Sequence, residues 1–159
     1  MTYGVVAIEG VRDAAKTRAA KLPQEDPLRE QLQQLASDSD KLRSKIVATK
    51  EGGMITGEER IRELLGQLYG AVAQYDGKPT DYQVARTESL GHELQDVIDD
   101  FQRLAQKDLP AINNGLQKKK LESIALLSES DWQKKRVEES SASGGLGVHV
   151  LERRPGKRD

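Results

Sequence analysis

The 159-residue chain contains no cysteine and few aromatic residues, and both absences exclude classes of protein. Without cysteine there is no disulfide, no thiolate zinc site and no cysteine nucleophile, so any metal must be held by His, Asp or Glu. The aromatic residues are one Trp, one Phe and four Tyr, or 4% of the chain. A core must therefore be built mainly from Leu, Ile, Val and Ala, which suits helices.

A strong net charge and a long hydrophobic run are also missing. The chain has 25 basic and 26 acidic residues, so its formal net charge is -1 and no global field favours nucleic acid or an anionic membrane. No stretch approaches the roughly 20 apolar residues of a membrane span, and "MTYGVVAIEGVRD" lacks the basic start of a signal peptide. We expect a soluble chain, cytoplasmic as expressed, with neither a nucleic-acid nor a membrane partner.

The hydrophobic spacing predicts helices. Asp26 is a candidate N-cap before Pro27, and Gly52-Gly53 supplies a stop, so we expect a helix from 27 to about 50. Its apolar positions alternate steps of four and three, which is a heptad seam. The seam consists of Leu28, Leu32, Leu35, Ser39, Leu42 and Ile46.

Two further helices follow, each opened by a predicted capping box. Thr56 with Glu59 precedes a stripe on one helix, and Thr80 with Gln83 begins the next. Pro110 is expected to kink that last helix or to start a new one. The first stripe is Ile61, Leu64, Leu65, Leu68 and Val72, and the second, with four-three spacing, is Leu90, Leu94, Val97, Phe101 and Leu104.

The two ends of the chain are less regular. The first 25 residues suggest another helix, and "SESDWQKKRVEE" suggests a short one that carries Trp132. Residues 140–159 are rich in Ser and Gly and end in basic residues, which is typical of a disordered tail. We therefore predict an all-α domain over 1–139, an antiparallel bundle of three to four long helices, followed by the tail. Two regular heptad seams also favour a homodimer.

Three short motifs in this helical frame resemble a known family. "LYG" at 68–70, "KPT" at 78–80 and "DLPAINNGL" at 108–116 are similar to the C-terminal helical region of bacterial sialidase-like or sortilin-like β-propeller repeat proteins, often labelled glycosyl hydrolases. The resemblance covers roughly residues 24 to 135. It implies an appendage that packs or associates beside a propeller, here as a stand-alone truncated fragment, and it implies no catalytic residue.

One polar stripe is a candidate metal site. On a helical wheel with Leu90 at zero, the side chains of Glu88, His92, Asp96 and Asp99 fall at about 160° to 240°, opposite the apolar stripe. His92-Glu93-x-x-Asp96 is related to the H-E-x-x-H zinc pattern, with the second His replaced by a carboxylate. Zn²⁺ or Mn²⁺ would suit these ligands, and Glu93 is the candidate catalytic base for hydrolysis of a small phosphoester. Such a site needs a second helix or subunit to cover it.

The same stripe is also typical of an ordinary solvated helix face, whose acidic residues pair with Arg86, Arg103 and Lys107. Lys118, Lys119 and Lys120 form a candidate anion patch, but basic residues commonly end a helix. The main hypothesis is thus a non-catalytic helical module for interaction and dimerisation. The alternative is a small metal-dependent phosphodiesterase-like hydrolase built on the His92 helix.

Overall fold

The computed structural model describes residues 3–49 and 58–143, and this part of the chain forms five helices and no strand. The predicted all-α class is confirmed. None of the helices in these two ranges is both long enough and apolar enough to span a bilayer. In chain order the helices are α1 (Tyr3–Ala19), α2 (Pro27–Ile46), α3 (Ile61–Ala73), α4 (Asp81–Lys118) and α5 (Glu129–Ser143).

The chain divides into two compact units, Met1–Leu127 and Ser128–Asp159. The first contains α1 to α4 and the second contains α5. Helix α5 is the predicted helix carrying Trp132, and the Arg136 guanidinium lies 4.9 Å from the centre of the indole ring. The predicted boundary at residue 140 stays a prediction, and residues 144–159 of the predicted tail lie outside the described residues.

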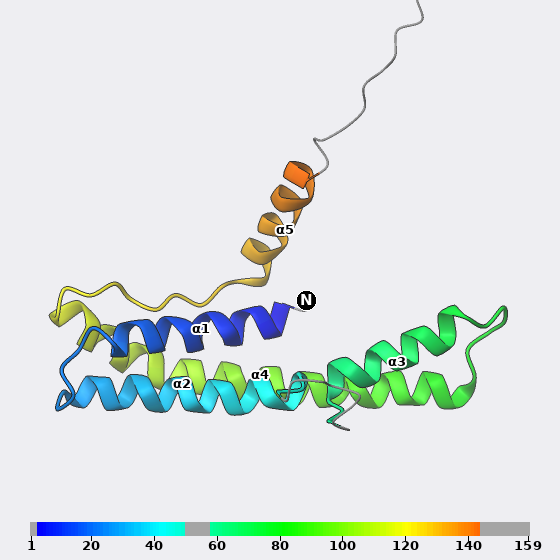
Figure 1. Ribbon diagram of the computed structural model, residues 1–159, viewed down its shortest axis with the longest axis horizontal. Helices are drawn as coiled ribbons and strands as arrows, with labels where there is room; N and C mark the ends of the chain where they lie inside the picture. The colour runs from blue at the N-terminus through cyan, green and yellow to red at the C-terminus, as the bar shows by residue number, and fades with distance from the viewer. Residues whose placement is uncertain (1–2, 50–57, 144–159) are drawn as a thin grey trace, which may run out of the picture. The chain divides into compact units, whose positions relative to one another are not determined.

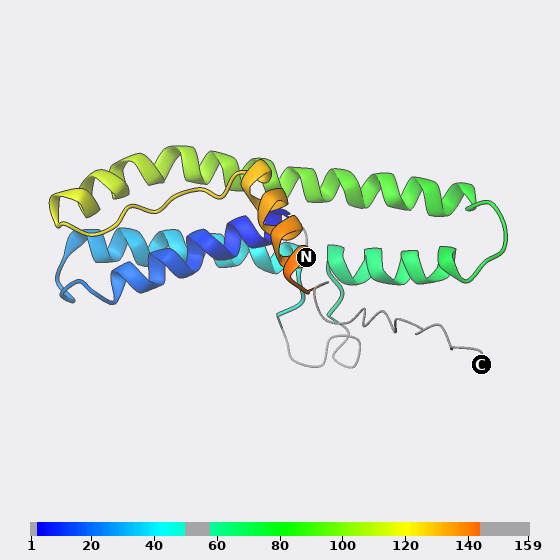
Figure 2. The ribbon, with the colours of Figure 1, turned by 90° about the horizontal axis from the view of Figure 1, so that it is seen from above.

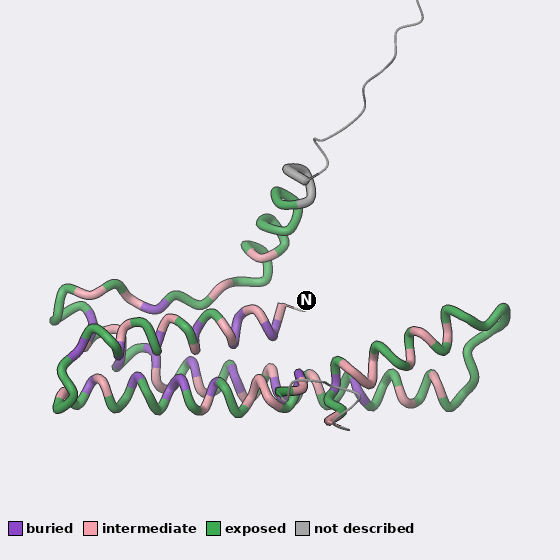
Figure 3. The backbone as a smooth tube through the Cα atoms, in the orientation of Figure 1, coloured by how far each residue is buried: buried purple, intermediate pink, exposed green. Residues whose placement is uncertain are grey.

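Helices α1, α2 and the C-terminal half of α4 pack together around the main core. Helix α1 runs antiparallel to α2, and α4 runs antiparallel to α2 on its other side (Figures 1 and 2). The buried positions face inward along all three helices (Figure 3). An ion pair of 2.6 Å between Glu9 and Arg43 joins α1 to α2 at the edge of this core. The largest fully buried side chains are Ile8, Val11, Leu32, Leu35, Ser39, Ile46, Leu90 and Leu116.

Helix α2 begins as predicted but ends four residues early. The Asp26 carboxylate accepts a hydrogen bond of 3.0 Å from the Leu28 N–H, which confirms the N-cap. The helix ends at Ile46, and Val47 already has an extended backbone. Val47 is buried, and its N–H still donates to the Arg43 carbonyl at 3.0 Å. The predicted stop at Gly52-Gly53 lies outside the described residues.

The capping prediction was wrong for α3 and is confirmed for α4. Helix α3 begins at Ile61, and the Glu63 carboxylate accepts a hydrogen bond of 3.2 Å from the Arg60 N–H, so Glu59 precedes the helix. Thr56 lies outside the described residues. At α4 the Thr80 N–H donates to the Gln83 side chain at 2.8 Å, and the Gln83 N–H donates to the Thr80 hydroxyl at 3.3 Å.

Helix α4 is 38 residues long in total and continues past Pro110, so no new helix starts there. Pro110 is exposed, while Leu109 and Ile112 beside it are buried. These apolar neighbours hold the helix on the core even though proline removes one backbone hydrogen bond. Figure 2 shows α4 bending in its C-terminal third, as the predicted kink requires.

The N-terminal half of α4 has a different environment. In the first unit, α1 and α2 accompany only its C-terminal half, and α3 runs antiparallel to its N-terminal half (Figures 1 and 2). We call α3, the following turn and the start of α4 the arm, residues 61–97. Ile61 is the one fully buried residue of α3. The arm is therefore a two-helix hairpin that projects from a three-helix body.

Candidate interaction surface on the arm

The predicted metal ligands lie on the outer surface of α4. Glu88, His92, Asp96 and Asp99 are all exposed, and so is Glu93. They share one side of the helix, as the wheel predicts, but no other described element of the first unit covers them.

Several of the neighbouring carboxylates already have partners in the chain. Asp99 accepts a hydrogen bond of 2.8 Å from the Gln95 amide. Glu93 lies 3.7 Å from the Arg86 guanidinium and accepts a hydrogen bond of 3.4 Å from the Ser89 hydroxyl. Asp100 pairs with Arg103 on α4 and with Lys45 on α2. Arg86 and Arg103 therefore pair with carboxylates beside the stripe, while Glu88, Asp96 and Asp99 form no ion pair within the described residues.

Within residues 3–49 and 58–143, no group of three or more His, Asp or Glu side chains is arranged to hold a metal ion. Glu88 and Asp99 are eleven residues apart, roughly 16 Å along the helix axis, so the four predicted ligands cannot all reach one ion from this helix. A metal site on this face would therefore need further ligands from a second helix or subunit, as the sequence also predicts. The metal site and the role of Glu93 as a base stay predictions.

The groove between α3 and α4 is the most apolar open surface of the arm. It has a volume of about 490 Å³. Its floor consists of the stripe residues Leu65, Leu68 and Val72 of α3, and Tyr69 stands at its edge with 76% of its surface exposed. The remaining lining residues are Pro79, Gln83, Val84, Thr87 and Glu88.

A second apolar pocket, of about 290 Å³, continues this surface toward the body. Leu65 lines both, and Val5 near the start of α1 lines the second. Val5 is 2% exposed and Ile61 is 5% exposed, so this second pocket lies against the buried core, next to the groove. The other residues of the second pocket are Ile46, Val47, Ile61, Arg62 and Leu94.

The opposite side of the arm is polar. Tyr82 is 75% exposed and lies about 160° round α4 from Val84, which lines the groove, by the 100° rotation per residue. The ion pair between Arg86 and Glu93 lies on the same side as Tyr82. The two faces of the hairpin therefore differ, and only the groove face combines exposure with an apolar floor.

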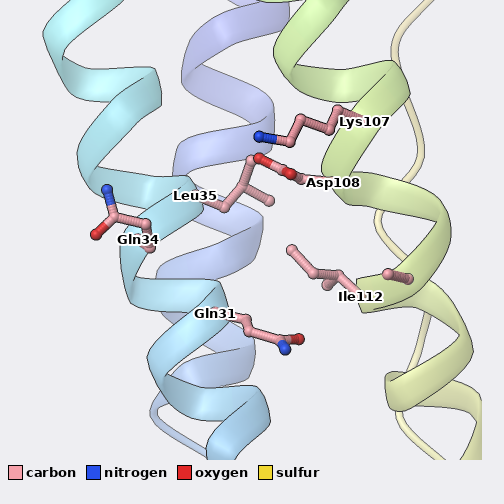
Figure 4. Close-up of a pocket in the computed structure, with 7 residues that line it drawn as sticks. Gln31, Gln34, Leu35, Lys107, Asp108 and Ile112 are labelled. Atoms are coloured by element: carbon pink, nitrogen blue, oxygen red, sulfur yellow. The ribbon is translucent and has the colours of Figure 1, made fainter.

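A smaller pocket, of about 240 Å³, lies between α2 and α4 in the body (Figure 4). Its floor is Leu35 and Ile112, and Gln31, Gln34, Lys107 and Asp108 surround it. Gln34 donates a hydrogen bond of 2.8 Å to Asp38. The pKa of Asp38 lies below its usual range because Lys41 and then Gln34 donate to the carboxylate. The Gln34 amide is thus already engaged within the chain.

The predicted anion patch at the end of α4 is partly used in the fold. Lys119 pairs with Asp26, the N-cap of α2, and this contact is the main reason that the pKa of Asp26 is lowered. Lys120 takes a positive φ of 58° and ends the helix, with Leu121 N–H donating to the Leu116 carbonyl at 2.9 Å.

The groove was not predicted from the sequence, although the hydrophobic pattern of α3 indicates an uncovered apolar face. Leu64, Leu65, Leu68 and Tyr69 cover a wider arc of α3 than one neighbouring helix can bury. A second helix of the chain covers only part of that arc.

Comparisons with models of protein families, with curated proteins and with solved structures found no match.

Proposed function

We propose that the protein is a non-catalytic helical interaction module that docks a partner helix in the groove of the arm. The apolar groove lined by Leu65, Leu68, Tyr69 and Val72 of α3 is the observation that carries this proposal. It agrees with the resemblance to the helical appendage of propeller proteins, which also implies association.

The energetics favour an occupied groove. Full burial of one large apolar side chain contributes about 1.5 to 3 kcal/mol, and the groove presents several that are incompletely covered. Tyr69 and Val84 are 76% and 47% exposed. Aromatic residues at the edge of an apolar depression are frequent anchors in interfaces. A third helix laid along α3 and α4 would give the arm the three-helix packing that the body already has.

Two kinds of occupant fit this geometry: a second copy of the chain, as the heptad seams predict, or a helix of another protein. The seams themselves are used inside the chain. Leu32 and Leu35 of α2, and Leu90 and Phe101 of α4, are buried. The predicted homodimer would therefore form through the arm.

Two tyrosines of equal exposure make a matched test. Tyr69→Asp places a charge at the groove, and Tyr82→Asp places the same charge on the opposite side of the arm. The probe is an 18-residue helical peptide with a Leu/Ile stripe, and fluorescence anisotropy measures its binding. Sedimentation velocity measures self-association, and circular dichroism verifies that both variants fold.

We expect Tyr69→Asp to weaken peptide binding or self-association by at least about tenfold, because a buried unpaired carboxylate costs more than 1.4 kcal/mol. Tyr82→Asp should change neither quantity by more than about twofold. Equal effects of the two substitutions, or no association of any kind, would show that the groove is not a docking surface.

A further inference from the structure

We infer that the helix docked in the groove is a basic amphipathic helix, with an apolar stripe flanked on one side by Lys or Arg. The inference rests on the proposed function and names the chemistry of the partner. It comes from the distribution of charge along the two edges of the groove.

The arm carries an excess of acidic residues. Residues 61–97 contain six Asp and Glu against three Lys and Arg. Two of those basic residues are already neutralised inside the arm, because Arg62 pairs with Glu63 at 2.8 Å and Arg86 with Glu93 at 3.7 Å. The exposed acidic residues that remain are Asp76, Asp81, Glu88 and Asp96.

The charge follows one edge of the groove. Glu88 lines the groove and has no ion-pair or hydrogen-bond partner in the part of the chain that the structure describes. Asp81 is also exposed and lies seven residues earlier, on the same side of α4. Arg62 of α3, which lines the second pocket, already pairs with Glu63 at 2.8 Å. A docked helix would therefore meet the carboxylates of Glu88 and Asp81 on its α4 side.

A second copy of the arm does not match this edge. It would bring the same acidic excess to the interface, and like charges facing each other across an interface reduce affinity. A partner helix with Lys or Arg flanking its apolar stripe would instead bring positive charge to the acidic edge of the groove. Helix α3 has 13 residues and is about 20 Å long, so three to four turns of the partner would fill the groove.

The test uses three helical peptides of 18 residues with one identical Leu/Ile stripe and with Lys, Gln or Glu at the flanking positions. Binding to the whole protein is measured by anisotropy at about 20 mM and about 500 mM salt. We expect the Lys peptide to bind at least about tenfold more tightly than the Glu peptide at low salt. The difference should shrink at high salt because exposed charges are screened.

Substitutions of two carboxylates of α4 test whether the preference for the Lys peptide arises at the edge of the groove. Glu88→Gln should weaken the Lys peptide roughly threefold, which is the usual contribution of one exposed charge pair. Asp96→Asn is the matched control, because Asp96 is also exposed but lies about 80° further round α4 and does not line the groove. It should leave the affinity within about 1.5-fold of the wild type.

The outcomes separate the two proposals. Equal binding of the three peptides, each lost in Tyr69→Asp, would overturn the basic partner and leave the docking function standing. A concentration-dependent dimer that Tyr69→Asp abolishes would make a second copy the occupant and also overturn it. Absence of both peptide binding and dimer would overturn the docking function itself.

Discussion

Replacement of Ser39 by Ala should stabilise the protein, although Ser39 lies in the centre of the core. Ser39 occupies the fourth of the six places of the α2 heptad seam, where the spacing predicts an apolar residue. Its side chain is 0% exposed, and its hydroxyl oxygen has no hydrogen-bond partner in the described part of the chain. Folding therefore removes this hydroxyl from water without compensation.

The magnitude follows from three contributions. An unsatisfied buried polar group costs about 1 to 3 kcal/mol, and Ser39→Ala removes that cost. Alanine is also a better helix former than serine by about 0.5 kcal/mol. Loss of one oxygen atom leaves a small void, which costs roughly 0.5 kcal/mol. The last two contributions cancel, so the variant should be more stable by about 1 to 3 kcal/mol.

Urea unfolding followed by circular dichroism measures this change, and the slope of the transition should stay constant because the exposed surface hardly changes. Ser37→Ala, at an exposed position two residues earlier on the same helix, is the control for helix propensity. A Ser39→Ala variant no more stable than Ser37→Ala would refute the argument, since the hydroxyl would then cost nothing in the native state.

Three further predictions concern the arm, acid and metal. Amide hydrogens of α3 should exchange faster than those of α1 and α2, because Ile61 is its one fully buried residue, and mass spectrometry of proteolytic fragments checks this. The pKa of Asp38 is lowered mainly by Lys41 and that of Asp13 mainly by Arg12, so both carboxylates stabilise the fold above their unfolded pKa. That contribution should be lost as pH falls below about 4, and Asp38→Asn should flatten the decline in urea titrations between pH 7 and 3. Metal content per chain, by elemental analysis, should be low and equal in wild type and His92→Ala; near-stoichiometric zinc lost in the variant would favour the hydrolase.

Local sequence signals predicted the helices well where a cap and a seam agree. Asp26 with Pro27, and Thr80 with Gln83, begin α2 and α4 at the expected residues. The errors came where two local signals compete. Glu59 and Glu63 both follow candidate caps, and only the tertiary position of Ile61 selects Glu63. Helix α2 likewise ends at Ile46, before the glycines that were predicted to end it.

The division of α4 between two neighbours was beyond local reasoning. Its apolar positions keep the same four-three spacing beside α3 and beside α2, so the sequence pattern does not show where one neighbour ends and the next begins. Gly4 of α1 packs against Ile98, and an added Cβ there would lie 3.2 Å from that side chain. At this contact α1 joins α2 and α4, and the three-helix packing of the body begins. The groove lies before that point, which is why the wide apolar arc of α3 stays uncovered.

Glu88 belongs to two competing interpretations of α4, and Asp96 distinguishes them. In the metal interpretation Glu88, His92 and Asp96 act together, so loss of any one should weaken metal binding and hydrolysis. In the docking interpretation Glu88 faces the partner helix, while Asp96 lies outside the groove and stays in water. Asp96→Asn should therefore be neutral for peptide binding and damaging for a metal site. An Asp96→Asn variant that keeps the affinity for the Lys peptide, beside a Glu88→Gln variant that loses part of it, would place the carboxylate of Glu88 in a protein interface.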